Sequence, residues 1–301
     1  MRIAVVGDVH GHLELMYAIL GRWQRESGER LDLILQCGDM GSYSSVDEAD
    51  RATLRHAQRD PEELGFAAFA GPTPPSTALD PRPSLVFIPG NHEDFAYLEE
   101  CERRAADEHG APREGDQPDG ASPRIYPISE DGLIGALRSG ETWTFAAHGR
   151  ALRVAGVSGA AGRARKQGRH PRLHIDEEGA LRLAAAGRDA FDVLISHDGP
   201  SDVWEGAVRP GSEALRLLIE ECQPRLAFFG HHDRVGEWTI GRTRVFALAG
   251  CGYQPYGSWR LKQGGIALLH WDGQRAIVER LDREWLRAAT LASWRHWERA
   301  R

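Results

Sequence analysis

Residues 3–11 read Ile-Ala-Val-Val-Gly-Asp-Val-His-Gly, and this stretch decides the fold. Its apolar beginning predicts a short buried strand, which ends at an Asp-x-His motif formed by Asp8 and His10. Buried polar side chains are costly unless they are paired or hold a metal ion. A lone Asp-x-His is usually a helix cap or a surface pair, so its meaning depends on the rest of the chain.

Further clusters repeat this arrangement, because each one stands directly behind a short apolar run that predicts a strand. They are Gly38-Asp39, Gly90-Asn91-His92-Glu93, Ser196-His197-Asp198 and Gly230-His231-His232-Asp233, behind the runs 33–35, 85–88, 193–195 and 226–229. Such strand ends can gather imidazole, carboxylate and carboxamide groups at one edge of a sheet. We therefore predict a metal site at that edge.

The composition is that of an ordinary soluble globular protein, since 41% of the 301 residues are hydrophobic and 27% are charged. No apolar stretch approaches the roughly 18 residues of a membrane span, and the apolar start is too short for a signal peptide. The four cysteines lack Cys-x-x-Cys spacing, which is typical of reduced thiols and predicts a cytoplasmic protein. A formal charge of -7 argues against a general nucleic-acid coat but permits a local basic cleft.

The order of predicted elements indicates one α/β domain. Residues 3–35 read as strand, helix and strand, which predicts a right-handed parallel pair. Residues 124–157 read as short strands with a hairpin turn at His148-Gly149, and the chain is β-rich again over 235–281. This alternation predicts two packed sheets with helices outside, over residues 1–281. We expect residues 282–301 to form a C-terminal helix packed on the domain.

The side chains of the five clusters suit particular metals. Asp, His and Asn are ligands for Mn²⁺, Fe or Zn²⁺ rather than for a soft thiolate metal. Two ions about 3.5–4 Å apart can clamp the attacking and leaving oxygens of a phosphoryl centre, and a metal-bound water whose pKa falls to about 7 supplies hydroxide. A histidine that holds no metal could then protonate the leaving group. The clusters therefore indicate hydrolysis of a phosphate ester.

The ordered series Asp-x-His, Gly-Asp, Gly-Asn-His-Glu, His and Gly-His resembles the calcineurin-like metallophosphoesterases over roughly residues 1–250. The spacing is most similar to the RNA lariat debranching branch, through Cys37-Gly38-Asp39, the long insert after it and Gly156-Val157-Ser158-Gly159. It differs from the protein Ser/Thr phosphatases, whose second block continues into Asp-Arg-Gly where this chain has Met40-Gly41-Ser42-Tyr43. The resemblance implies an αββα fold, a two-sheet sandwich flanked by helices.

The resemblance also implies a role for each matching residue. Asp8 and His10 would bind the first of two divalent metal ions, Asp39 would bridge both ions, and Asn91, His197 and His231 would bind the second ion. His92 would be the catalytic residue that protonates the leaving oxygen or steadies the phosphate.

One position departs from the family pattern. The last ligand of the family is the second histidine of Gly-His-x-His, and Asp233 stands in its place. If this segment is extended, Asp233 faces the same way as His231 while His232 points away, so we expect Asp233 to complete the first metal site. An added carboxylate favours harder cations, so Mn²⁺ is expected, with Fe, Zn²⁺ and Mg²⁺ as alternatives.

A basic loop follows the Gly-rich strand end at 156–159. Arginine forks match phosphate oxygens, so this loop can bind substrate, although a solvated loop is an equal alternative. Its candidate substrate-binding residues are Arg163, Arg165, Lys166 and Arg169. The substrate would be a phosphodiester or phosphomonoester, with a nucleotide or RNA as candidates. Two other functions stay open: a hydrolase of nucleotide or dinucleotide polyphosphates, and a binding scaffold with little catalysis.

Overall fold

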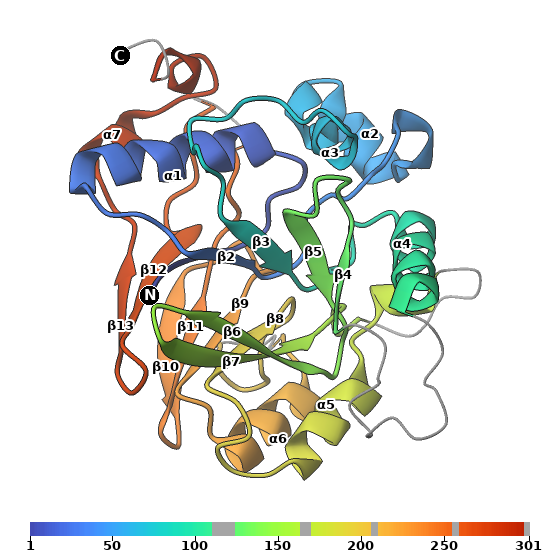
Figure 1. The fold of residues 1–301 in the computed structure, drawn as a ribbon, viewed down its shortest axis with the longest axis vertical. Coiled ribbons are helices and arrows are strands. Elements are labelled where there is room, and N and C mark those ends of the chain that lie inside the picture. The colour runs from blue at the N-terminus through green and yellow to red at the C-terminus, as the bar shows by residue number, and fades with distance from the viewer. Residues whose placement is uncertain (110–123, 163–169, 206–209, 255–258, 298–301) are drawn as a thin grey trace.

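The computed structural model describes residues 1–109, 124–162, 170–205, 210–254 and 259–297. Two β-sheets pack face to face, and helices cover the outer face of each sheet (Figure 1). The two-sheet sandwich flanked by helices is therefore confirmed as the fold. Among the described helices, none is long and apolar enough to cross a bilayer.

The first sheet has seven strands in the order β13-β12-β1-β2-β3-β5-β4. Their bounds are β1 Arg2–Val6, β2 Leu33–Gln36, β3 Ser84–Phe87, β4 Ile125–Pro127, β5 Ile134–Leu137, β12 Ile266–Trp271 and β13 Ala276–Arg280. Strands β1, β2, β3 and β5 run parallel, and the predicted parallel pair of β1 and β2 is confirmed. Their carboxyl ends therefore lie along one edge of the sheet.

The second sheet has six strands in the order β10-β11-β9-β8-β7-β6. Their bounds are β6 Thr142–Ala147, β7 Arg150–Val157, β8 Val193–Ser196, β9 Leu226–Phe229, β10 Gly236–Ile240 and β11 Thr243–Ala247. The hairpin predicted at His148-Gly149 is confirmed, because both residues have positive φ angles, 53° and 68°, in the two-residue turn between β6 and β7. Strands β7, β8, β9 and β11 are parallel, so a second set of carboxyl ends is aligned.

Helices lie on both outer faces of the sandwich (Figure 1). Their bounds are α1 Leu13–Ser27, α2 Arg51–Ala57, α3 Phe66–Ala70, α4 Phe95–His109, α5 Glu177–Ala185, α6 Glu213–Cys222 and α7 Glu284–Ala288. Short 3₁₀ turns occur at Val46–Glu48, Pro61–Leu64, Pro171–Leu173 and Trp294–His296. Helix α1 ends at Gly28, whose φ of 71° is the left-handed conformation that closes many helices.

The apolar core has three layers, and β1 shows how the sequence builds two of them. Alternate residues of a strand face opposite sides of the sheet. Ile3 and Val5 accordingly pack between the sheets, whereas Ala4 and Val6 pack under the helices of the first sheet. A third layer joins the second sheet to α5 and α6. Because β1 is covered on both faces, its continuous apolar run is the pattern expected of a buried parallel strand.

The C-terminal tail differs from the expected single helix. It forms the short helix α7 and a 3₁₀ turn, with Leu286 and Trp294 buried against the layer beneath α1. The helix is interrupted between them, because the backbone of residues 289–291 pairs with residues 259–261. The helical pattern in the tail could not reveal these hydrogen bonds, because their partners lie in a distant segment of the chain.

Candidate metal centre

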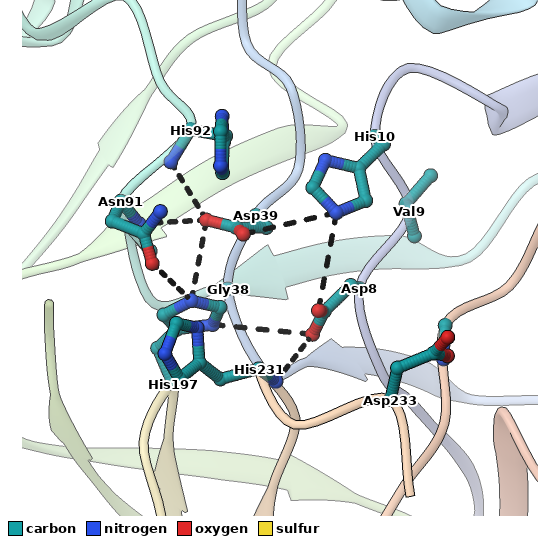
Figure 2. A network of polar contacts seen from close by, with 12 residues as sticks. Asp8, Val9, His10, Gly38, Asp39, Asn91, His92, His197, His231 and Asp233 are labelled. Atoms are coloured by element: carbon teal, nitrogen blue, oxygen red, sulfur yellow. Dashed lines mark hydrogen bonds and ion pairs between the residues drawn. The ribbon is translucent and has the colours of Figure 1, made fainter. Parts of the chain in front are cut away.

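The predicted clusters meet at one edge of the sandwich, where both sets of parallel strands end (Figure 2). Asp8, Asp39 and Asn91 follow β1, β2 and β3 of the first sheet, and His197 and His231 follow β8 and β9 of the second. The loops behind parallel strands thus bring together residues that lie up to 223 positions apart, as in the hydrogen bond between Asp8 and His231.

Among the described residues, three groups of side chains could each hold a metal ion: one is His12, Asp60 and Glu62, and the other two share one residue. Ligand atoms of Asp8, His10 and Asp39 lie within 4.8 Å of one another, and so do those of Asp39, His197 and His231. We name them the first metal group and the second metal group, respectively. The Asn91 side chain lies beside the second, because its Oδ1 is 3.1 Å from His197 Nε2.

Asp39 lies between the two groups and is held there by the backbone. Its Oδ1 accepts N–H hydrogen bonds from Asn91 at 2.6 Å and from His92 at 2.7 Å. The same carboxylate lies 3.3 Å from His197 Nε2 and 3.8 Å from His10 Nε2. The side chain is almost fully buried. A fixed carboxylate that faces both groups is the arrangement required of a bridging ligand.

The orientation of His197 fits a metal ligand. Its Nδ1–H donates to the Cys37 carbonyl at 3.1 Å, which leaves Nε2 facing the oxygens of Asp39 and Asn91. Ligating histidines commonly donate their second ring N–H in this way. Burial alone would lower the pKa of His197, but the nearby Asp39 raises it to about 10.

The other ligand candidates have charge states that match this interpretation. Burial raises the pKa of Asp8 to about 7 although His197 Nδ1 lies 3.9 Å from its Oδ1, so a cation bound beside this carboxyl group would favour its ionised form. Burial also lowers the pKa of His10 and of His231 to about 4, which keeps both imidazoles neutral at pH 7. Neutral imidazole and ionised carboxylate are the forms that bind metals. The donor set therefore fits divalent cations.

Two glycines make room for the carboxylates. A Cβ at Gly90 would lie 2.2 Å from Asp39 Oδ1, and a Cβ at Gly230 would lie 2.0 Å from Asp8 Oδ1. Neither distance is possible without movement of the carboxylate or of the backbone. The glycines of the Gly-Asn-His-Glu and Gly-His motifs are therefore needed for space.

His92 lies beside both metal groups and is oriented by a residue that the sequence did not reveal. Its Nδ1–H donates to Asp50 Oδ2 at 2.9 Å, and its ring centre is 5.4 Å from that of His10. The other Asp50 oxygen caps α2 by accepting the N–H groups of Ala52 and Thr53. Burial alone would lower the pKa of His92, but the hydrogen bond to Asp50 raises it to about 9. His92 therefore holds a proton at neutral pH.

A cavity of about 400 Å³ opens beside the first metal group. Its floor is the Asp-x-His loop, and its walls come from the insert between β2 and β3 and from the segment before β12. The lining includes Asp8, His10, His12, Arg55, Arg59, Asp60, Glu63, Tyr253, Trp259 and Lys262. His12 connects the floor of the cavity to one wall. Its Nδ1–H donates to the Val9 carbonyl in the floor, and its Nε2 contacts Asp60 in the wall, both at 2.9 Å. The cavity offers cations and an aromatic ring next to the metal centre.

A family model described as calcineurin-like phosphoesterase matches residues 1–234. The chain belongs to this family. The match includes the five motifs and the site they form, so the resemblance inferred from them is confirmed. It also confirms the expected class of enzyme, a metal-dependent hydrolase of phosphoric esters.

Curated relatives from several organisms carry the name lariat debranching enzyme, which confirms the most similar branch. The protein of Drosophila melanogaster is 24% identical over 262 residues, which are 77% of this chain and 42% of that protein. The protein of Caenorhabditis briggsae is 26% identical over 271 residues, which are 76% of this chain and 46% of that protein. The protein of Arabidopsis thaliana is 23% identical over 260 residues, which are 77% of this chain and 54% of that protein. The chain spans about half the length of the curated relatives it matches.

Solved structures share the fold. A protein of Thermus thermophilus superposes with a TM-score of 0.51 at 15% identity, and the match covers 93% of this chain and 99% of that one. At this level of identity the likeness concerns the architecture alone.

The position where this chain departs from the family does not have the conformation that we expected. His231 and Asp233 have φ angles of 63° and 50°, so the turn after Gly230 is not extended. Asp233 lies to one side of the metal groups (Figure 2), where its Oδ2 is 2.8 Å from Lys262 Nζ. His232 points away from them, as expected, and contacts Asp198 at 2.7 Å. The structure brings Asp233 into neither metal group.

The candidate phosphate-binding residues Arg163, Arg165, Lys166 and Arg169 lie outside the described residues. The segment that follows them turns toward α4, where Arg172 pairs with Glu102 at 2.8 Å.

Proposed function

We propose that this chain hydrolyses a phosphodiester with the help of two divalent cations. The observation that carries the proposal is Asp39, whose buried carboxylate faces both metal groups. Asp8, His10 and Asp39 would hold the first cation, and Asp39, Asn91, His197 and His231 the second. A pair of cations so bound supplies Lewis acidity for the phosphoryl oxygens and a hydroxide nucleophile at neutral pH.

The proposed cation is Mn²⁺. Once Asn91 is counted with the second metal group, carboxylate and carboxamide oxygens form half or more of the proposed donors to each cation, with imidazole as the remainder. This mixture favours a hard or borderline ion over one that prefers thiolate. Buried Cys37 lies next to the site, and burial raises its thiol pKa, so it stays protonated and is a poor competitor for the ion.

His92 is the proposed proton donor to the leaving oxygen. Asp50 fixes the ring through Nδ1, which leaves Nε2 to face the substrate. An imidazolium with a pKa of about 9 is protonated at neutral pH and can give its proton to an alkoxide as the ester bond breaks. Asp50 would therefore act on the reaction through His92 as a positioning residue.

The cavity supports a diester rather than a monoester as substrate. Its volume of about 400 Å³ leaves space for a second substituent on the phosphate, next to Asp8 and His10. Trp259 could contact a base and Arg55 and Arg59 a neighbouring phosphate. The names of the relatives direct attention to RNA with a 2′,5′ linkage, which is the substrate we propose to test first.

The basic loop remains a proposed phosphate contact. If Arg165, Lys166 and Arg169 bind substrate, changing all three to alanine should raise KM for an oligonucleotide and leave bis(p-nitrophenyl) phosphate almost unaffected. Unchanged kinetics on both substrates would make it a solvated loop.

The proposed function is tested with metal-free protein reloaded with Mn²⁺. Turnover of bis(p-nitrophenyl) phosphate, p-nitrophenyl phosphate, diadenosine tetraphosphate and 2′,5′- and 3′,5′-linked dinucleotides should be compared, with D39N as the inactive control. We expect the aryl diester to exceed the monoester and the 2′,5′ linkage to be cleaved. Preference for the tetraphosphate would favour a polyphosphate hydrolase, and metal binding without any turnover would favour a binding scaffold.

A further inference from the structure

Both carboxylate oxygens of Asp233 have partners outside the metal groups. Oδ2 lies 2.8 Å from Lys262 Nζ, and Oδ1 accepts the N–H of Gly250 at 3.1 Å. The Asp233 side chain is 50% exposed, so this ion pair fixes the position of the carboxylate more than it adds stability. Asp233 is therefore engaged away from Asp8, His10 and Asp39, although it stands where the family pattern has a metal ligand.

The backbone around Asp233 keeps the carboxylate in this place. A positive φ is uncommon for a residue other than glycine, and here it occurs at both His231 and Asp233. Between them, His232 is fixed by its contact with Asp198, which is fully buried. Turning Asp233 toward the first metal group would therefore require a rearranged turn as well as a broken ion pair.

Lys262 is placed next to the first metal group by a separate part of the chain. Its backbone N–H donates to the Gly252 carbonyl at 2.9 Å, and its side chain lines the same cavity as Asp8 and His10. A Cβ at Gly250 would lie 3.5 Å from both the Asp8 carbonyl oxygen and Lys262 Nζ. The ammonium group is thus separated only by Gly250 from the loop that carries Asp8 and His10.

We propose that Lys262 keeps Asp233 out of the first metal group, so that the first cation is held weakly and exchanges readily while the second is held tightly. This inference rests on the proposed function, because it assumes that both groups bind a cation. The first group then offers Asp8, His10 and Asp39, whereas the second adds Asn91 to its three members. The position left open on the first cation would be available to a substrate oxygen.

The test is Mn²⁺ binding to metal-free protein, measured by calorimetry and by electron paramagnetic resonance, with no assay of hydrolysis. Wild type should show one tight and one weaker site. Asp233→Ala should leave the weaker site within about threefold of wild type, because Asp233 is not a ligand. Lys262→Met should tighten it by about tenfold or more, since contacts around a metal ligand commonly change affinity by about 10–100-fold.

A double-mutant cycle separates release of Asp233 from the loss of a nearby positive charge. If release is the cause, Lys262→Met should tighten the weaker site far less in the Asp233→Ala background than in wild type. Lys262→Arg, which keeps the ion pair, should resemble wild type and checks that the segment still folds. Arg287→Met removes a cation that pairs with exposed Asp282, and should change nothing.

Three results would overturn the inference: a tenfold loss of the weaker site in Asp233→Ala, unchanged affinity in Lys262→Met, or equal gains in both backgrounds. Failure of the proposed function looks different, because it would leave these metal affinities as expected while no phosphodiester is cleaved.

Discussion

The two metal groups differ in how the fold encloses them. In the second metal group His197 is fully buried between the ends of the two sheets, whereas in the first the His10 side chain is 32% exposed beside a cavity. A backbone carbonyl fixes the His197 ring of the second group. The first group borders the insert after β2 and the segment before β12, which lie far apart in sequence. If both groups bind cations as proposed, this difference predicts that the second group retains its cation and the first receives substrate.

The shared residue Asp39 should show the largest effect, because changing it removes the common member of both groups. Asp39→Asn should abolish activity and most binding of both metals, since the bridging charge is lost. Metal content by mass spectrometry and turnover of an aryl diester measure this. Asp47→Asn, an exposed carboxylate in a 3₁₀ turn, is the matched control and should behave as wild type. Two bound metals in active Asp39→Asn protein would refute the bridge.

The role of His92 can be separated from metal binding. His92→Ala should retain both cations but lose about 10²–10⁴-fold in turnover of a dinucleotide, the usual contribution of general acid catalysis. The loss should be much smaller for bis(p-nitrophenyl) phosphate, because nitrophenolate leaves without a proton. An equal loss on both substrates would mean that His92 positions phosphate instead.

Asp50 should alter the pH dependence more than the rate at neutral pH. The pKa of His92 is raised to about 9, so its acid form persists to that pH and is lost as the pH rises further. Asp50→Asn removes the charge that raises this pKa and should move the alkaline limb of the kcat profile toward about 6.5, the ordinary value for histidine. If the limb stays in place, another group controls it.

The cavity beside the first metal group should have the smallest effect. Arg55 and Arg59 line it, whereas Arg51, on the same helix as Arg55, lies outside the lining. Changing Arg55 and Arg59 to alanine should raise KM for an oligonucleotide severalfold, with less effect at high salt, because exposed charges are screened. Arg51→Ala should change neither KM nor turnover. Equal effects of the two changes would make the cavity irrelevant to substrate binding.

The metal centre could be predicted from the sequence because each motif combines a short apolar strand with the polar residue at its end. Asp8, Asp39 and His197 each follow such a run, and parallel strands align their ends. The pattern is local, so five local patterns in order were sufficient to indicate the family, the fold and the gathering of these side chains.

The surroundings of the site depend on contacts between distant segments, which no local pattern contains. Asp50 appeared only as one acid in a charged insert, yet it caps α2 and orients His92. Lys262 carried no motif at all. The expectation for Asp233 assumed an extended segment, and a positive φ at His231 or Asp233 has only a weak sequence signal. In the same way, pairing of residues 289–291 with 259–261 interrupted the helix expected in the tail.

Gly90 and Gly230 provide a criterion for judging other chains with this set of motifs. Neither has a positive φ, so an alanine would suit the backbone at both positions and its side chain would still collide with Asp39 or Asp8. A chain that retains all the polar residues but has a larger residue at either glycine should therefore have lost the metal site. Such chains could be sorted as inactive members from two letters of their sequence, and restoring glycine should return metal binding to them.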